Sequence, residues 1–287
     1  MALRDTKPAR LLNLVKFQHT VFALPFAVIS ALVCAGGWPT WRQIGLILLC
    51  MVSARTAAMA FNRIADYELD ARNPRTRDRE LPSGAVRLWE AQALTVVSAA
   101  VFILSAHGLN DLCFWLSPVA LFIILSYSYT KRFTSWTHAV LGLSLAIAPV
   151  GAWIAISGRF AVPPFALAAA VVLWVAGFDI IYATLDYDFD RREGLRSAVR
   201  RYGIAPALRL SALLHVGFLA ALLAFGYAAH LGPAYYAGAV LAGVFLLYEH
   251  AIVRPTDLRR VNTAFFTVNG IISLLLVIAT AADIWLA

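Results

Sequence analysis

The sequence predicts an all-α integral membrane protein. Its 287 residues are 61% hydrophobic and only 14% charged, and the mean hydropathy is +0.74. A soluble domain of this size carries roughly 25% charged residues. The apolar residues also come in long runs, and about 20 apolar residues are enough to span the hydrocarbon core of a bilayer. Because lipid offers the backbone no hydrogen-bond partners, each run should form a helix.

We expect about nine transmembrane helices in a single domain that covers residues 1–287. Gly and Pro cluster between the apolar runs. Because these residues do not continue a helix easily, they mark short turns. Prolines inside a span are tolerated in membrane bundles, because neighbouring helices satisfy the freed backbone groups. The expected spans are approximately residues 15–35, 43–63, 91–108, 111–130, 138–157, 163–185, 206–229, 234–253 and 262–286.

The basic residues fall mainly on one side of the membrane. With nine spans and a cytoplasmic N-terminus, most of the 24 Lys and Arg residues lie in cytoplasmic segments. Arg42 and Arg159 fall on the other side, and Arg55 lies within a span. The positive-inside rule therefore predicts this orientation. Much of the net charge of +8 reflects topology, and we expect no nucleic-acid partner.

Two acidic motifs lie about 120 residues apart, each at the end of an apolar span. In both motifs the polar residues are spaced by four, which places them above one another on one face of a helix. Ionisable residues at membrane depth are candidates for function by default. The motifs are Asn62-x-x-x-Asp66-x-x-x-Asp70 and Tyr182-x-x-x-Asp186-x-x-x-Asp190, with Asp179 just upstream of the second.

The chemistry of these motifs suits Mg²⁺ and a phosphorylated substrate. Mg²⁺ binds through one or two carboxylates together with substrate phosphates. It would also offset the repulsion of facing carboxylates and stabilise a departing diphosphate. Arginine is suited to phosphate because its planar fork binds two oxygens at once. The basic residues placed nearest by topology are Arg75, Arg79, Lys131, Arg132 and Arg196.

The matched motifs predict an internal repeat. Four spans separate them, so both face the cytoplasm, and each is followed by a basic loop. We expect two parallel four-helix repeats, about residues 12–135 and 136–253, around a central cavity, with an extra helix at about 262–286.

Arg55 has two possible roles. It lies seven residues before Asn62 and so on a similar helix face. One interpretation is an ion pair with Asp179, and the other is recognition of a substrate carboxylate. The six histidines, in contrast, show no metal-ligand spacing.

These residues resemble those of a known family. The stretch from Asn62 to Asp70, continuing through Arg75-Thr76, Arg79 and the sequence Leu-Pro-Ser-Gly at 81–84, is similar to the first signature of the UbiA superfamily of intramembrane prenyltransferases. The stretch Asp179–Asp190 is similar to its second signature, and residues 127–132 match a tyrosine and lysine pattern after its fourth helix. The resemblance covers nearly the whole chain.

The resemblance implies a role for each matching residue, with Mg²⁺ as cofactor and a polyprenyl diphosphate as donor. Asn62, Asp66, Asp70, Asp186 and Asp190 would hold Mg²⁺ and diphosphate. The expected diphosphate ligands also include Lys131 and Tyr127, whereas Arg75 and Arg79 would lie on a cytoplasmic cap. Lys16 stands where many members have a basic residue on the first helix.

The implied acceptor is an aromatic acid, either 4-hydroxybenzoate or a naphthoate-like acid, for ubiquinone or menaquinone biosynthesis. The stretch from His19 to Pro25 departs from the Lys-Pro-x-Gly pattern of ubiquinone-type members. It resembles instead the subgroup linked to menaquinone synthesis by the futalosine route, whose members are often called 4-hydroxybenzoate polyprenyltransferases. We expect the protein to lie in the bacterial inner membrane, with the mouth of its active site facing the cytoplasm.

The predicted mechanism is attack of an aromatic ring carbon on an allylic cation that an apolar cavity shields from water. Asp179 is a candidate proton acceptor, and Tyr127, Tyr182 or Trp153 could stabilise the cation through their π faces. A cation-coupled transporter is the alternative that the Asp clusters also permit. Against it, the carboxylates crowd one side and do not line a path. A non-catalytic scaffold would leave the matched motifs unexplained.

Overall fold

The computed structural model describes residues 11, 14 and 23–286. Within this part of the chain the regular structure is helical, with one isolated β-bridge between Arg254 and Asp257. Among the described residues, eight helices are long and apolar enough to cross a membrane, and α2 (Leu24–Ala35) is a shorter apolar helix. Residues 15–22 of the first expected span lie outside the described residues, so the count of nine spans stays a prediction.

The chain divides into two compact units. One contains residues 44–129 and the start of the chain, and the other contains residues 21–43 and 130–287. The long helices that lie largely or wholly in the first unit agree with the expected spans to within about three residues. They are α3 (Trp41–Ala65), α5 (Leu88–Leu109) and α6 (Asp111–Thr130), and the short helix α4 (Tyr67–Arg72) follows α3.

The segment between α4 and α5 is folded back onto the first unit. Leu81 and Val86 are buried against Ala60 of α3 and Ala91 of α5. At the start of α5, Glu90 accepts a hydrogen bond from the backbone N–H of Arg87 at 2.8 Å, which caps the helix. The segment after the first acidic motif is therefore held by a small apolar core of its own.

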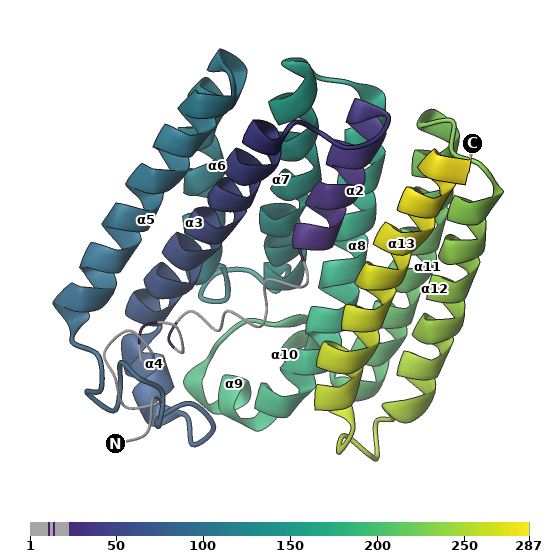
Figure 1. The fold of residues 1–287 in the computed structure, drawn as a ribbon. Helices are drawn as coiled ribbons and strands as arrows, with labels where there is room; N and C mark the ends of the chain where they lie inside the picture. Colours follow the sequence, from purple (N-terminus) through teal and green to yellow (C-terminus); the bar gives the residue numbers. More distant parts are fainter. Residues whose placement is uncertain (1–10, 12–13, 15–22, 287) are drawn as a thin grey trace, which may run out of the picture. The chain divides into compact units, whose positions relative to one another are not determined.

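The second unit contains most of the helices (Figure 1). Here α2 packs against α7 and α13, while α8 packs against α7 and α11. Its elements are α2, α7 (Thr137–Ser157), α8 (Val162–Ala183), the 3₁₀ turn η3 (Thr184–Asp186), α9 (Tyr187–Glu193), α10 (Ala198–Tyr202), α11 (Ile204–Ala228), α12 (Pro233–Ile252), the π-helical segment η4 (Thr263–Val268) and α13 (Asn269–Leu286).

Helix α8 is the centre of the second unit. Trp174 is fully buried and lies 5.1 Å, between ring centroids, from Phe26 and 5.0 Å from Phe178. The helices approach closely where the side chain is only a hydrogen: a Cβ added at Gly142 would lie 2.5 Å from the carbonyl oxygen of Val172. Such close approach of small residues is the usual way in which helices pack inside a membrane.

The outward faces of the long helices are apolar. Val96, Phe122, Leu213 and Leu247 are all more than half exposed, and each lies on a helix long enough to span. A soluble protein rarely exposes so much apolar surface. The structure therefore agrees with the predicted integral membrane class.

The connection between α12 and η4 is a tight polar turn outside the spans. Asp257 accepts hydrogen bonds from the guanidinium of Arg259 at 2.9 and 2.7 Å and from its backbone N–H at 3.1 Å. These bonds hold the pKa of the Asp257 carboxyl well below its usual range. The turn leads into η4, which has π-helical hydrogen bonding. Such segments are rare in proteins, and those that occur frequently lie at functional sites.

Candidate active site

The first acidic motif lies at the junction of α3 and α4. Its backbone keeps helical spacing, since the N–H of Asp66 donates to the carbonyl of Asn62 at 2.9 Å and that of Asp70 donates to Asp66 at 2.7 Å. The side chains of Asn62 and Asp66 meet at 3.3 Å, and the Asn62 amide also donates to Ser128 of α6 at 3.4 Å. The prediction that Asn62 and Asp66 share one face is confirmed.

The expected continuous helix is interrupted at the central aspartate of this motif. Asp66 has φ −98° and ψ 7°, which ends α3 at Ala65 and makes Asp66 the N-cap of α4. Both Asp66 and Asp70 are nevertheless buried, at 4% and 6% exposure. Two carboxylates at these positions need cations close to them, because burial of an unpaired charge is costly.

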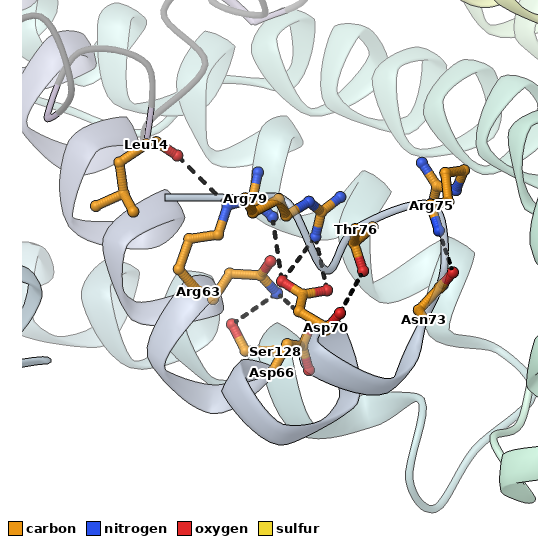
Figure 2. Close-up of polar contacts among 10 residues, drawn as sticks. Leu14, Arg63, Asp66, Asp70, Asn73, Arg75, Thr76, Arg79 and Ser128 are labelled. Carbon is orange, nitrogen blue, oxygen red and sulfur yellow. Dashed lines mark hydrogen bonds and ion pairs between the residues drawn. The ribbon is translucent and has the colours of Figure 1, made fainter. Parts of the chain in front are cut away.

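One such cation is Arg79, which reaches back from the segment after α4 (Figure 2). Its Nη1 lies 2.8 Å from both carboxylate oxygens of Asp70. Arg63 of α3 adds a second positive charge, with Nη1 at 3.9 Å from Asp70, and its Nε donates to the carbonyl of Leu14 at 3.4 Å. Thr76 fixes the same turn by donating to the carbonyl of Asp70 at 3.1 Å.

The other residues of the first unit that were predicted for the site lie on different elements of that unit. Arg75 is exposed, and its backbone N–H donates to the side chain of Asn73 at 2.9 Å. Tyr127 lies half-buried in the last turn of α6. Arg55 lies two turns before Asn62 on α3, and its buried Nε has no hydrogen-bond partner among the described residues. Lys16 lies outside the described residues.

The second motif repeats the local geometry of the first. Helix α8 ends at Ala183, and a 3₁₀ turn leads to Asp186, which is the N-cap of α9. Asp186 has φ −104° and ψ 8°, within a few degrees of the values at Asp66. Asp190 follows one turn later on α9. Each motif thus carries one Asp at a helix break and the next Asp on the short helix that follows.

Asp179 has a partner that sequence reasoning did not identify. Its Oδ2 lies 2.6 Å from Nδ1 of His138 on α7, and the Nε2 of His138 accepts a hydrogen bond from the backbone N–H of Ala198 at 3.3 Å. Since Nε2 is an acceptor, Nδ1 carries the proton and donates it to Asp179. His138 therefore orients one Asp179 oxygen, while the Asp179 side chain remains 18% exposed.

The loop that carries Lys131 is fastened to the segment after α9. The backbone N–H of Arg196 donates to the carbonyl of Lys131 at 2.6 Å, and its guanidinium donates to the carbonyl of Phe133, also at 2.6 Å. The N–H of Leu195 donates to the carbonyl of Asp190 at 3.0 Å. These bonds tie the loop of Lys131 to α9 within the second unit, and Arg196 acts as the link.

Tyr182 lies between Asp179 and Asp186 and is supported by η4. The centroid of its ring is 4.2 Å from that of Phe265, and Phe265 in turn lies 5.1 Å from Phe178. The half-buried Tyr182 ring therefore has a fixed aromatic neighbour on α13's π-helical entry. An aromatic face held in this way is suited to stabilise a nearby carbocation.

The donor chemistry of both motifs fits Mg²⁺. Within either unit, the described residues include no group of three or more His, Cys, Asp or Glu side chains that could hold a metal ion without other ligands. Each motif does supply two aspartates one helical turn apart, and the first adds an amide oxygen. Mg²⁺ usually keeps several waters and binds through one or two carboxylates plus phosphate oxygens, so these sets are sufficient.

A sequence-family comparison agrees with this geometry. Residues 23–271 match the model of the UbiA prenyltransferase family. The 4-hydroxybenzoate octaprenyltransferase of Burkholderia ambifaria is 30% identical over 249 residues, which cover 86% of each chain. The enzyme of the same name from Ralstonia nicotianae is also 30% identical, over 87% of this chain and 85% of its own.

Solved structures agree in fold. A UbiA homologue from Aeropyrum pernix, in its apo form, is 34% identical and superposes with a TM-score of 0.80 over 93% of this chain and 97% of its own. A UbiA homologue from Archaeoglobus fulgidus, solved with GPP and Mg²⁺, is 20% identical and has a TM-score of 0.75 over 96% of this chain and 99% of its own. The second likeness concerns the fold alone.

Proposed function

Because the chain belongs to the UbiA prenyltransferase family, we propose that it transfers a polyprenyl group from a polyprenyl diphosphate to a ring carbon of an aromatic acid in the membrane. The observation that carries this proposal is the matched pair of broken-helix motifs, each with two aspartates and adjoining basic residues. Family membership favours the enzyme over the cation-coupled transporter that the aspartates alone also allowed.

The two motifs are proposed to serve the donor. Bound Mg²⁺ would bridge the carboxylates to the diphosphate and offset the negative charge of the leaving group. Asn62, Asp66, Asp70, Asp186 and Asp190 are the proposed ligands. Arg79 supports this role, because it is 23% exposed and already holds Asp70 in a charge-assisted pair. Arg79, Arg75, Lys131, Tyr127 and Lys16 are the proposed diphosphate contacts.

The same charges drive the transfer step. As the bond between the prenyl carbon and the diphosphate oxygen breaks, the positive ends of Arg79 and Lys131 stabilise the charge that develops on oxygen. The prenyl carbon then forms a bond to a ring carbon of the acceptor. Tyr182 is the residue proposed to stabilise the cationic prenyl carbon through its π face, and its ring contact with Phe265 supports this role.

The ring must then lose a proton, and Asp179 is the proposed acceptor. His138 donates to Oδ2, which leaves Oδ1 of Asp179 available to take the proton from the ring carbon. His138 stays neutral in this step, because its Nε2 already accepts a hydrogen bond from the backbone N–H of Ala198. His138 is therefore a positioning residue, and Asp179 is the residue that would touch the substrate.

Arg55 is the proposed contact for the carboxylate of the acceptor. The buried Nε of Arg55 has no hydrogen-bond partner among the described residues, and the carboxylate of an aromatic acid would supply an acceptor for it. The relatives named for 4-hydroxybenzoate favour that acid. A naphthoate-like acid of the futalosine-route menaquinone subgroup is the second candidate, on the sequence between His19 and Pro25 alone.

We further propose that both motifs face the cytoplasm, in the inner membrane of a bacterium. The bacterial relatives support the location, and the distribution of Lys and Arg supports the orientation. The two-repeat arrangement around one cavity is likewise a proposal, supported by the equal backbone geometry at Asp66 and Asp186.

The direct test uses the protein in lipid nanodiscs with a labelled polyprenyl diphosphate. We expect diphosphate release that requires Mg²⁺ and an aromatic acid together, with the prenylated acid identified by mass spectrometry. 4-Hydroxybenzoate and a dihydroxynaphthoate would be compared at equal concentration. Diphosphate release that is the same with and without every aromatic acid would contradict the proposed acceptor chemistry.

A further inference from the structure

Two fully buried polar residues join α12 to α13 inside the second unit. Glu249 and Asn269 both have 0% exposure. The Nδ2 of Asn269 donates to Oε1 of Glu249 at 3.0 Å and to the carbonyl of Ala264 in η4, also at 3.0 Å. Both hydrogens of the amide therefore have acceptors, and this arrangement fixes which way the amide points.

The remaining oxygen of each side chain is unsatisfied. Oδ1 of Asn269 and Oε2 of Glu249 are both buried and have no hydrogen-bond partner among the described residues. With an ionised Glu249, both atoms are acceptors and neither can satisfy the other. One proton on Oε2 would make that oxygen a donor, and Oδ1 of Asn269 is the unsatisfied acceptor of the same pair.

Among the described residues, no cationic side chain is paired with Glu249. Within the part of the chain that the structure describes, the carboxyl group of Glu249 has no ion pair, and its one hydrogen bond comes from Asn269. The neighbouring His250 is bonded to His215 of α11 at 2.9 Å. His215 donates through Nε2 to the carbonyl of Trp174 at 3.3 Å, so its Nδ1 accepts from His250. A buried carboxylate without a cation is far less stable than a neutral acid.

We propose that Glu249 is a neutral carboxylic acid joined to Asn269 by two parallel hydrogen bonds, and that this acid–amide pair positions η4 for catalysis. The amide hydrogen donates to Oε1, and the acid hydrogen donates to Oδ1. The second amide hydrogen holds the carbonyl of Ala264, which is a residue of η4 itself. The pair thus fastens the π-helical segment to α12.

The consequence reaches Tyr182 through the aromatic side chains of η4. Phe265 follows Ala264 directly and lies 4.2 Å from the ring of Tyr182, between ring centroids. Loss of the pair should therefore loosen η4 and the aromatic face beside Asp179 and Asp186. This step rests on the proposed function of Tyr182, whereas the protonation of Glu249 does not.

The pair makes a sharp prediction about Glu249→Gln. A glutamine amide donates to Oδ1 and its oxygen accepts from Nδ2, so both hydrogen bonds are kept. We expect Glu249→Gln to retain kcat and the KM for the prenyl diphosphate within about twofold, whereas Glu249→Ala should lower kcat about tenfold, because the π face of Tyr182 would stabilise the cationic prenyl carbon less well. Hydrogen–deuterium exchange of residues 263–268 should rise in Glu249→Ala and not in Glu249→Gln.

Infrared spectroscopy tests the proton itself and needs no activity. At pH 7 the wild-type protein should show the carbonyl stretch of a buried protonated carboxyl group, and Glu249→Gln should lack it. The exposed Glu68→Gln variant is the control and should keep the band. An unchanged spectrum in Glu249→Gln, or a Glu249→Gln variant as inactive as Glu249→Ala, overturns the proposal. If Glu249→Ala does not fold, the infrared comparison still decides. If the band disappears while no prenyl transfer is found in any protein, the proposed function fails and the acid–amide pair stands.

Discussion

Asp66 and Asp186 have the same backbone conformation at the same point of two motifs that lie about 120 residues apart. Their φ and ψ values are −98° and 7° for Asp66 and −104° and 8° for Asp186. Asp66 directly follows a long helix, Asp186 follows one after a 3₁₀ turn, and each is the N-cap of a short helix. The break turns the next aspartate, Asp70 or Asp190, onto a short helix at the end of the span.

This equivalence predicts that the two central aspartates are equally necessary. Asp66→Asn and Asp186→Asn should each reduce kcat/KM about 100-fold or more, because metal-assisted charge stabilisation contributes several kcal/mol. Asp188→Asn is the matched control, since Asp188 is exposed and lies between Asp186 and Asp190 in the second motif. Steady-state kinetics in nanodiscs, with circular dichroism to confirm folding, provides the comparison. A strong effect at one aspartate alone would contradict the equivalence.

The long spans were predictable from the sequence because they depend only on apolar length. The ends expected at residues 111–130 and 138–157 agree with α6 and α7 to within one residue. Family, reaction class and all-helical membrane fold are likewise confirmed. The break at Asp66 was not predictable, because Ile-Ala-Asp-Tyr contains no Gly or Pro to mark it.

The partners of the motif residues were also beyond the sequence. His138 lies 41 residues before Asp179, and only the packing of α7 on α8 brings them together. The sequence places Arg63 only among the basic residues of the cytoplasmic side, whereas in the structure its Nη1 lies 3.9 Å from the carboxylate of Asp70. Contacts of this kind depend on tertiary packing, for which helical periodicity gives no signal.

Arg79 should matter for donor binding more than its neighbours do. In Arg79→Gln, the contacts of Nη1 with both carboxylate oxygens of Asp70 are lost, which leaves a buried carboxylate short of one cation. We expect the KM for the prenyl diphosphate to rise about tenfold, since a hydrogen bond to a charged group contributes about 1.5–3 kcal/mol. Exposed Arg77→Gln is the control in the same segment. Equal KM values in the two variants would show that Arg79 has only a topological role.

His138 should affect turnover and not donor affinity. His138→Phe keeps a planar ring but removes the donor to Asp179, so the proton acceptor loses its orientation. We expect kcat to fall about tenfold with little change in the KM for the donor, because Asp179 itself remains and only part of a general-base contribution of about 10²–10⁴-fold is lost. His138→Asn offers a side-chain N–H close to the position of Nδ1 and should restore part of the loss. A rise in KM with unchanged kcat would argue for a purely structural histidine.

Asp283 should be important for stability and irrelevant to chemistry. Its carboxylate on α13 accepts hydrogen bonds from the N–H groups of Gly232, Ala234 and Tyr235, at 2.5, 3.1 and 3.3 Å, and so caps the first turn of α12. Loss of these acceptors in Asp283→Ala should lower the free energy of unfolding by about 1–3 kcal/mol. Thermal unfolding in detergent measures the change, and kcat below the melting transition should stay unchanged. A large loss of kcat in folded protein would contradict this assignment.

Arg55 should decide which acceptors are used. If its guanidinium binds the acceptor carboxylate, Arg55→Met should raise the KM for the aromatic acid at least about tenfold and leave the KM for the donor unchanged. Arg42→Met, a change of an exposed arginine in the first turn of the same helix, is the control.

The methyl ester of the acid separates carboxylate recognition from an ion pair with Asp179. The wild-type enzyme should use the ester much less well than the acid, and Arg55→Met should use the two almost equally. In a double-perturbation cycle, the effects of removing the arginine and removing the carboxylate charge would then fail to add, because they remove the same interaction. An arginine that only pairs with Asp179 would instead give additive effects, since the ester would be discriminated equally by both proteins. Additivity would therefore reject Arg55 as the acceptor contact and leave the donor site untouched.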